Sequence, residues 1–215
     1  MNSSLLARRV KTEKPMRPVL DFFFFYGSIY TYLSVMRIEK LATAAGLEVR
    51  WCPFNLREIL IEQDNTAFTR NLARMSYCWR DVQRRAARHG LDFVSRPPYP
   101  VDAELLALRV GVIAANEGWC PRYSRATFGN WFIDHKVTGL PDHVSEVLAR
   151  VGQPAGEILA RASSAEADRL LNQTTKAARD FGVFGSPSFV VQNELFWGDD
   201  RLEEAIEFCQ SRFPD

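Results

Sequence analysis

Apolar residues run almost without interruption from Val19 to Tyr26. A run without alternation is typical of a strand that is buried on both faces of a sheet. From Ser28 to Ala45 the apolar residues recur at helical spacing, and Gly46 predicts the end of that helix. Residues Leu47 to Pro53 alternate between polar and apolar side chains, which predicts a second strand. Strand, helix and strand in so short a stretch predict a parallel β-α-β unit.

The pattern changes between Arg57 and about Arg179, where helical periodicity dominates and clusters of glycine and proline interrupt it. We expect an inserted helical region there. Its predicted helices run over Asn71 to His89, Asp102 to Asn116, and Ala126 to Lys136, with shorter ones between Asp142 and Ala162.

Short strands return near the C-terminus. A helix over Glu166 to Asp180 precedes two predicted strands, Ser186 to Val191 and Glu194 to Trp197, and a helix over Asp200 to Phe213 follows them. The whole order is that of an α/β protein with a thioredoxin-like fold, in which a helical domain is inserted between the two halves of the sheet. We expect 18–56 and 180–215 to form the thioredoxin-like domain, and 57–179 to form the inserted domain and its connecting helix.

Composition narrows the choice of partners. The 27 Lys and Arg residues nearly balance the 26 Asp and Glu residues, which argues against nucleic acid. No apolar run approaches the roughly 18 residues of a membrane span, so we expect no membrane partner. Residues 1–17 lack the apolar middle of a secretory signal, and we expect a disordered tail with Met16 as an alternative start.

The cysteines are far apart in sequence and form neither a Cys-x-x-Cys pair nor a zinc-ligand spacing. We therefore expect no metal, and reduced thiols in a cytoplasmic protein. The four residues are Cys52, Cys78, Cys120 and Cys209.

A hydroxyl stands at the junction between the first strand and the first predicted helix. Ser28 occupies the position where a redox protein of this layout carries a cysteine. Helix N-termini hold unpaired backbone N–H groups and a partial positive charge, so a group placed there stabilises an anion such as a thiolate. Ser28 is therefore our candidate catalytic residue. The alternative is that it only caps the helix.

Two further segments carry candidate chemistry. Pro187 opens a predicted strand, where a cis peptide bond would direct the backbone of Ser186 outward to pair with a peptide-like ligand. The alternative is a rigid turn without a ligand. Asp199 and Asp200 open the last predicted helix, where acids are commonly caps. In a thioredoxin-like sheet these segments converge with Ser28 on one edge.

With these motifs in order, the chain from about Val19 to its end resembles the 2-hydroxychromene-2-carboxylate isomerases, which are related to kappa-class glutathione transferases and to DsbA-like proteins. The motifs that carry the resemblance are Phe25 to Leu33, Pro53 to Ile59, Asp64 with Asn65, Tyr77 with Asp81, Pro98 to Arg109, Gly182 to Pro187, and Phe196 to Arg201.

The resemblance implies bound glutathione, with its thiol near Ser28. It also implies a cysteinyl backbone paired with Ser186 beside Pro187, and a γ-glutamyl end near Asp199 and Asp200. Two further glutathione contacts follow from matching positions, Asn65 and Arg74.

The substrate side is expected to be aromatic or cationic, and its candidates are Tyr30, Tyr77 and Arg109. Other arginines available to a substrate carboxylate are Arg84, Arg85 and Arg201.

The implied activity is a glutathione-dependent cis-trans isomerisation of 2-hydroxychromene-2-carboxylate or a similar small aromatic molecule, by reversible thiolate addition. Two alternatives remain: conjugation of electrophiles, as in the kappa class, and peptide binding by a redox-inactive thioredoxin-like protein. Disulfide exchange is excluded at this position because Ser28 to Thr31 contains no thiol. Relatives often form dimers, and the aromatic composition permits a homodimer interface. Ile29 stands where relatives commonly carry proline, which bears on the approach to Ser28.

Overall fold

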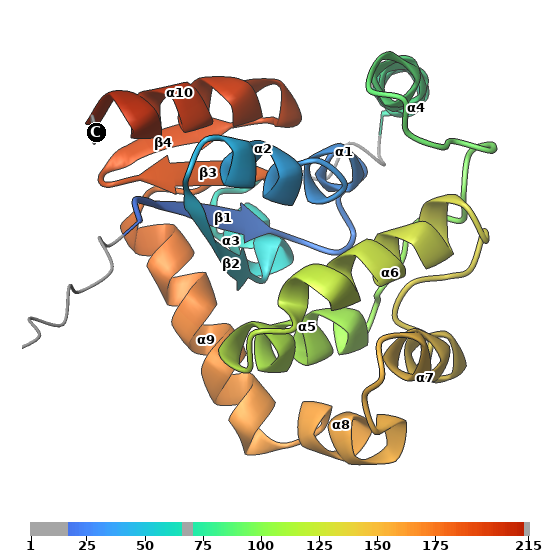
Figure 1. Cartoon of the computed structure of the whole chain (residues 1–215). Coiled ribbons are helices and arrows are strands. Elements are labelled where there is room, and N and C mark those ends of the chain that lie inside the picture. Colours follow the sequence, from blue (N-terminus) through green and yellow to red (C-terminus); the bar gives the residue numbers. More distant parts are fainter. Residues whose placement is uncertain (1–16, 66–70, 213–215) are drawn as a thin grey trace, which may run out of the picture.

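A four-stranded mixed sheet lies at the centre of the computed structural model, which describes residues 17–65 and 71–212 (Figure 1). The strands are β1 (Val19–Phe24), β2 (Glu48–Pro53), β3 (Ser188–Val191) and β4 (Glu194–Trp197), in the order β2-β1-β3-β4. β1 is parallel to β2 and antiparallel to β3, and β3 is antiparallel to β4. The predicted β-α-β unit and the C-terminal hairpin are both present.

Helices cover both faces of the sheet, which explains the continuous apolar run of β1. Phe22 and Phe24 pack on one face, and Phe23 belongs to a separate cluster on the other. The short helices α1 (Thr31–Val35) and α2 (Ile38–Ala44) pack with α10 (Leu202–Arg212) on the face of Phe22 and Phe24. On the Phe23 face lie α3 (Leu56–Glu62) and the end of α9 (Ala165–Asp180).

The predicted helical segment between the two halves of the sheet is confirmed. After α3 it consists of α4 (Leu72–Arg88), α5 (Leu106–Asn116), α6 (Cys120–Phe132), α7 (Pro141–Arg150) and α8 (Ala155–Ala162). α5 packs against β2 and α9, so one apolar core runs from the sheet into this segment. α4 faces α1 and also packs through Trp79 against Trp131 and Phe132 of α6.

The first predicted helix, Ser28 to Ala45, is wrong at its start and in its continuity. The helix begins at Thr31, ends at Val35, and resumes as α2 from Ile38. Arg37 stands at the break, where its Nε donates to the Leu33 carbonyl at 3.1 Å and its guanidinium pairs with Asp199. A long-range ion pair thus overrides the local helical pattern.

Two other helix starts differ from the prediction by four residues or more. α6 begins at Cys120 instead of Ala126, with Pro121 in its first turn, where a missing N–H costs nothing. α5 begins at Leu106 instead of Asp102. Asp102 has a φ of 54°, and its carboxylate accepts the backbone N–H groups of Ala107 and Leu108 at 2.9 and 3.2 Å. Asp102 is therefore not part of α5, and its side chain caps the first turn of the helix from the preceding loop.

All four cysteines are free, as expected, and Cys78 is the least buried of them. Burial raises the pKa of Cys52 and of Cys120 to about 12, so neither is a reactive thiolate. Over residues 17–65 and 71–212, every helix is too short or too polar to cross a bilayer.

Candidate functional site

The turn after β1 places Ser28 at the edge of the sheet. The Ser28 backbone N–H donates to the Phe25 carbonyl at 3.0 Å, and its half-buried hydroxyl donates to the Ser186 carbonyl at 2.7 Å. The residue that precedes α1 is Tyr30, which makes no side-chain capping bond. Ser28 is therefore not a helix cap, and the prediction that it opens a long helix is also wrong. Its hydroxyl points across the sheet edge to the loop before β3.

That loop contains the predicted cis peptide bond between Ser186 and Pro187. The Ser186 hydroxyl accepts the Phe25 backbone N–H at 2.9 Å and lies 2.9 Å from the Thr31 hydroxyl. The Ser186 carbonyl is taken by Ser28. Ser186 is thus held by residues on both sides of the Ser28 turn, so the two segments form one unit.

The third predicted segment joins the same unit through Gly198. Its N–H donates to the Pro187 carbonyl at 3.0 Å. Gly198 has a φ of 111°, and a Cβ atom there would lie 2.5 Å from an Asp200 carboxylate oxygen. Glycine is therefore required where the chain leaves β4. These contacts bring all three predicted segments to one edge of the sheet.

Two exposed aromatic rings stand beside this unit. Phe184 and Trp197 have ring centroids 4.8 Å apart and are 40% and 51% exposed. A Cβ atom on Gly185 would lie 2.1 Å from Trp197 Nε1, so the loop packs directly under the indole.

The two neighbouring acids point in opposite directions. Asp199 and Asp200 form a 3₁₀ turn, η2 (Asp199–Arg201), that precedes α10. The Asp199 side chain is fully buried, whereas that of Asp200 is 52% exposed and lies 3.7 Å from Arg201. Asp200 is therefore the accessible carboxylate of the pair.

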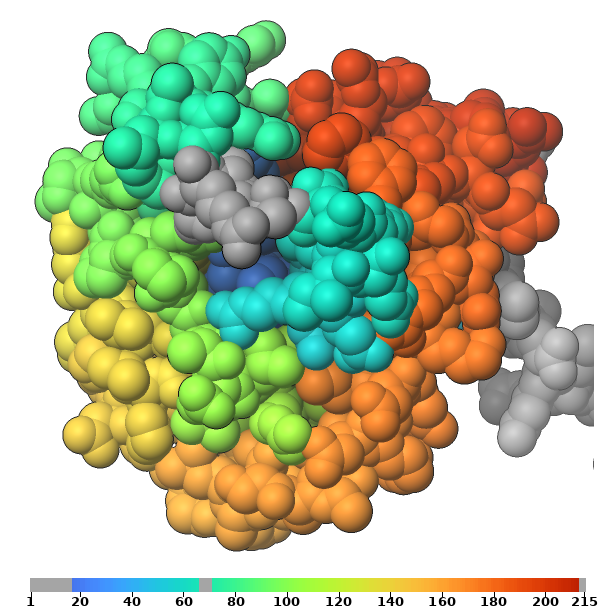
Figure 2. Space-filling model, turned by 180° about the vertical axis from the view of Figure 1, so that it is seen from behind, coloured from blue at the N-terminus to red at the C-terminus, as the bar shows by residue number. Residues whose placement is uncertain are grey.

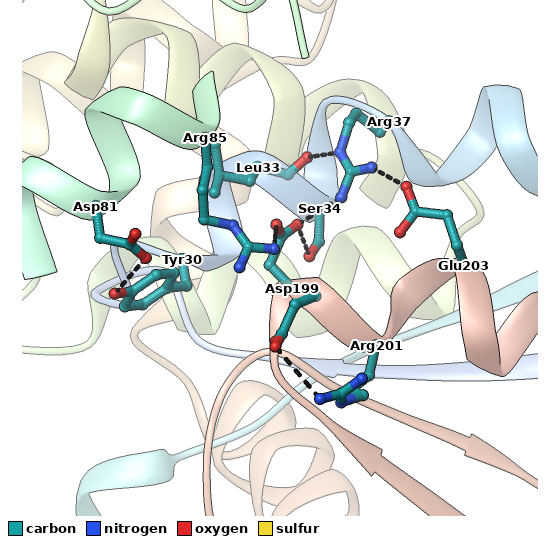
Figure 3. Close-up of polar contacts among 10 residues, drawn as sticks. Tyr30, Leu33, Ser34, Arg37, Asp81, Arg85, Asp199, Arg201 and Glu203 are labelled. Atoms are coloured by element: carbon teal, nitrogen blue, oxygen red, sulfur yellow. Dashed lines mark hydrogen bonds and ion pairs between the residues drawn. The ribbon is translucent and has the colours of Figure 1, made fainter. Parts of the chain in front are cut away.

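Buried donors surround the Asp199 carboxylate (Figure 3). One oxygen accepts from the Ser34 hydroxyl at 2.9 Å and from Arg37 at 2.8 Å. The other oxygen accepts from Arg85 at 2.7 Å. Arg37 also pairs with Glu203 on α10. Asp199 thus joins α1, α2, α4 and α10 at one point.

α4 reaches the Ser28 side of the unit as well. The Tyr30 hydroxyl donates to Asp81 at 3.1 Å (Figure 3). Asp81 also pairs with Arg84 at 3.0 Å. Burial, with Cys78 and Asp81 close by, raises the pKa of Tyr30. Tyr30 is therefore a neutral hydrogen-bond donor at neutral pH.

The other predicted residues lie away from these contacts. Asn65, Arg74 and Tyr77 are exposed, and Tyr77 packs under the Arg84 guanidinium. Arg109 pairs with Asp168 at 2.6 Å, so it joins α5 to α9. The structure does not bring these four side chains into contact with Ser28 or Ser186.

Two arginines of this region were missed by the sequence reasoning. Arg37, which pairs with Asp199, lies inside the predicted helix and was not singled out. Arg57 lies 5.0 Å from the Phe25 ring centroid and donates to the carbonyls of Val101, Asp102 and Ala103 at 2.7, 2.6 and 3.0 Å. Neither residue has a local sequence signal, because the partners are remote in the chain.

A hollow opens on the face seen in Figure 2. The first part of the described chain, in blue, forms its floor, and α3, the N-terminal part of the helical segment and the green stretch after α4 form its rim. α3 and α4 also contact the Ser28 turn, through Arg57 and Asp81. A separate cavity of about 400 Å³ lies between β2 and the start of α6, and none of the predicted site residues lines it.

Comparison with known proteins finds relatives that match most of this chain. The 2-hydroxychromene-2-carboxylate isomerase of Pseudomonas putida is 28% identical over 190 residues, which cover 86% of this chain and 90% of that protein. Glutathione S-transferase kappa 1 of Caenorhabditis elegans is 26% identical over 225 residues, which cover 93% of this chain and 94% of that protein. A solved 2-hydroxychromene-2-carboxylate isomerase structure matches with a TM-score of 0.78 at 26% identity, over 90% of this chain and 97% of that one.

These similarities confirm both the thioredoxin-like fold and the family resemblance drawn from the sequence motifs. The model of the DSBA-like thioredoxin domain matches residues 19–208. This match includes both halves of the sheet and the helices between them. The chain therefore belongs to the family of DSBA-like thioredoxin domains.

Proposed function

We propose that this protein is a glutathione-dependent isomerase that acts on 2-hydroxychromene-2-carboxylate or a similar aromatic molecule. The observation that carries the proposal is the Ser28 hydroxyl, which donates to the Ser186 carbonyl beside the cis-proline and not to the start of α1. A hydroxyl donor that is not used to cap α1 thus stands where a thiol-binding group is required. The similarity to the isomerases over nine tenths of their length supports the choice of reaction.

The residues present fit glutathione. The half-buried Ser28 hydroxyl suits a thiolate, the backbone of Ser186 suits a peptide group, and the exposed Asp200 carboxylate suits an α-ammonium group. Asn65 and Arg74, exposed at the α3 and α4 side, would complete the contacts. Asp199 is already occupied by its arginines, so we give it no direct contact with the ligand. When bound, glutathione supplies a thiol that adds reversibly to an electron-poor carbon.

Ser28 would do two things at once. Its hydroxyl, which donates to the Ser186 carbonyl in this structure, would turn its proton toward the sulfur and favour the ionised thiol. The carbonyl is then free to accept an N–H from the ligand backbone. Phe25 and Thr31 hold the Ser186 side chain, so this exchange needs only a hydroxyl rotation.

On the substrate side, Tyr30 lies beside this edge, just before α1, whereas Tyr77 on α4 is exposed and lies away from the Ser28 contacts. Tyr30 keeps its proton and would donate a hydrogen bond to a substrate oxygen in place of Asp81. Arg109 is paired with Asp168, so the geometry favours it less as the partner of a substrate carboxylate.

Calorimetric titration with glutathione, followed by an ultraviolet assay on 2-hydroxychromene-2-carboxylate, tests the proposal. We expect the native protein to bind glutathione, and Ser28→Ala to lose roughly 100-fold in kcat because one preorganised donor is removed. Ser145→Ala is the matched control, since its exposed hydroxyl bonds only to the Pro141 carbonyl at 2.8 Å.

The alternatives give other results. Stoichiometric consumption of glutathione would indicate conjugation, as in the kappa class. Extended peptides without a thiol that bind as tightly as glutathione would indicate a peptide-binding protein. Absence of glutathione binding by the native protein would overturn the proposal, and unchanged turnover in Ser28→Ala would remove the role of Ser28.

A further inference from the structure

One face of α4 contacts both ends of the candidate site. Asp81 and Arg85 are four residues apart and therefore lie on the same side of the helix. Asp81 accepts from Tyr30, two residues after Ser28, and Arg85 donates to Asp199, next to Asp200 (Figure 3). A rigid helix thus lies against the thiol end and the predicted γ-glutamyl end.

The pair between Arg85 and Asp199 is not an ordinary surface ion pair. The Asp199 side chain is fully buried, and the side chains of Arg37 and Arg85 are 10% and 24% exposed. Solvent screens such a pair far less than an exposed one. Arg85 Nε is also buried and has no hydrogen-bond partner among the described residues. The ion pair with Asp199 therefore orients Arg85, although this orientation leaves its Nε–H without a hydrogen-bond acceptor among the described residues.

The two arginines hold Asp199 from different elements. Arg37 lies between α1 and α2 and binds one carboxylate oxygen, and Arg85 binds the other from α4. Gly198, with its φ of 111°, turns Asp199 inward and leaves Asp200 outward. Any movement of Asp199 therefore moves the neighbouring Asp200.

We propose that Arg85 is a positioning residue, which acts through Asp199 to fix the η2 turn and so to orient Asp200 toward the α-ammonium group of the γ-glutamyl end. This inference rests on the proposed function, because it assigns a role within the same glutathione site. It predicts that Arg85 determines affinity for the γ-glutamyl end of the ligand and not for its thiol end.

A ligand truncation separates this role from a general one. We compare glutathione with cysteinylglycine, which lacks the γ-glutamyl group, by calorimetry on the native protein, Arg85→Gln and Arg80→Gln. Arg80 is the control, because it lies on the same helix and bonds only to the Gln83 side chain at 2.7 Å. We expect Arg85→Gln to weaken glutathione binding about tenfold, the effect of about 1.4 kcal/mol, and to leave cysteinylglycine binding unchanged. Arg85→Lys should restore part of the loss, and Arg80→Gln should change neither ligand.

Equal weakening of both ligands, or of neither, would overturn the inference. Hydrogen exchange tests it without any ligand. The Gly198 and Arg201 amides are both hydrogen-bonded within this region, to the Pro187 and Gly198 carbonyls. They should exchange faster in Arg85→Gln than in Arg80→Gln. If the native protein binds neither ligand, the proposed function fails, whereas unchanged exchange in Arg85→Gln refutes the positioning role itself.

Discussion

Asp199 and Asp102 are both almost inaccessible, at 1% and 2% exposure, but their surroundings differ. Asp199, at the candidate site, meets two guanidinium groups and a hydroxyl. Asp102, at the start of α5, meets the backbone N–H groups of Ala107 and Leu108. One region thus pairs its buried carboxylate directly with opposite charges, and the other holds its carboxyl by backbone dipoles, with Arg57 nearby.

This difference makes the stability of the Asp102 region depend on pH. Burial raises the pKa of Asp102 to about 6, although the backbone bonds and the nearby Arg57 lower it. The folded protein therefore holds this proton more tightly than the unfolded chain does. Stability contributed by protonated Asp102 is full below the ordinary aspartate pKa and is lost as the pH rises through about 6.

The largest loss of stability should come from removing the Asp199 carboxylate. Asp199→Ala leaves Arg37 and Arg85 without their shared carboxylate, and we expect it to lower the free energy of unfolding by about 3–5 kcal/mol. Asp200→Ala is the matched control, because that neighbouring side chain is half exposed, and it should change stability by less than about 0.5 kcal/mol. Urea denaturation measures both. Equal effects would refute the contrast between the two acids.

The next largest effect should come from removing the charge of Asp102. Asp102→Asn keeps the size and an acceptor oxygen, and we expect it to be more stable than the native protein by up to about 3 kcal/mol at pH 8. The advantage should vanish near pH 4, where native Asp102 is protonated. Denaturation at both pH values tests this, and a constant difference would show that the charge is not the cause.

Arg57→Gln tests the same region by removing the cation next to Asp102. Arg57 is the cation next to Asp102 and holds three carbonyls of the preceding loop. We expect the variant to lower the free energy of unfolding by about 2 kcal/mol at pH 5 and by more at pH 8. At pH 8 Asp102 is ionised, and Arg57 is the cation that lowers its pKa, so the variant leaves this charge without that cation. Arg57→Lys should lose less stability than Arg57→Gln, because lysine keeps the positive charge. A pH-independent effect would assign Arg57 to loop packing alone.

The smallest effect belongs to the rim of the Asp199 region. Glu203 pairs with Arg37, but its side chain is 48% exposed. We expect Glu203→Gln to cost less than about 1 kcal/mol, and the cost should shrink further in high salt. A loss comparable to that of Asp199→Ala would place Glu203 within the buried network instead of at its rim.

The outline of the fold could be predicted because its signals are local. The strand Glu194 to Trp197 matches the prediction, and α4 and α9 begin within one residue of it. The approach of Ser28, Ser186 and the Asp199 segment followed from the order of elements alone. Pro121 was an available signal for the start of α6 that the helical periodicity obscured.

The contacts that define the site could not be predicted, because they join residues remote in sequence. Arg85 and Asp199 are 114 positions apart. Two adjacent acids at a helix start are usually exposed caps, and nothing local indicates that one of them is buried. The break between α1 and α2 has the same origin, since Arg37 leaves the helical pattern to reach Asp199, 162 positions away.

Trp197 gives this sheet edge an optical signal of its own. The other four tryptophans are buried, whereas Trp197 is 51% exposed beside Phe184 and the cis-proline loop. A water-soluble quencher such as iodide therefore reaches the fluorescence of this indole and leaves that of the others unchanged. Occupancy of the cis-proline edge can thus be followed in the unlabelled native protein, with no probe attached.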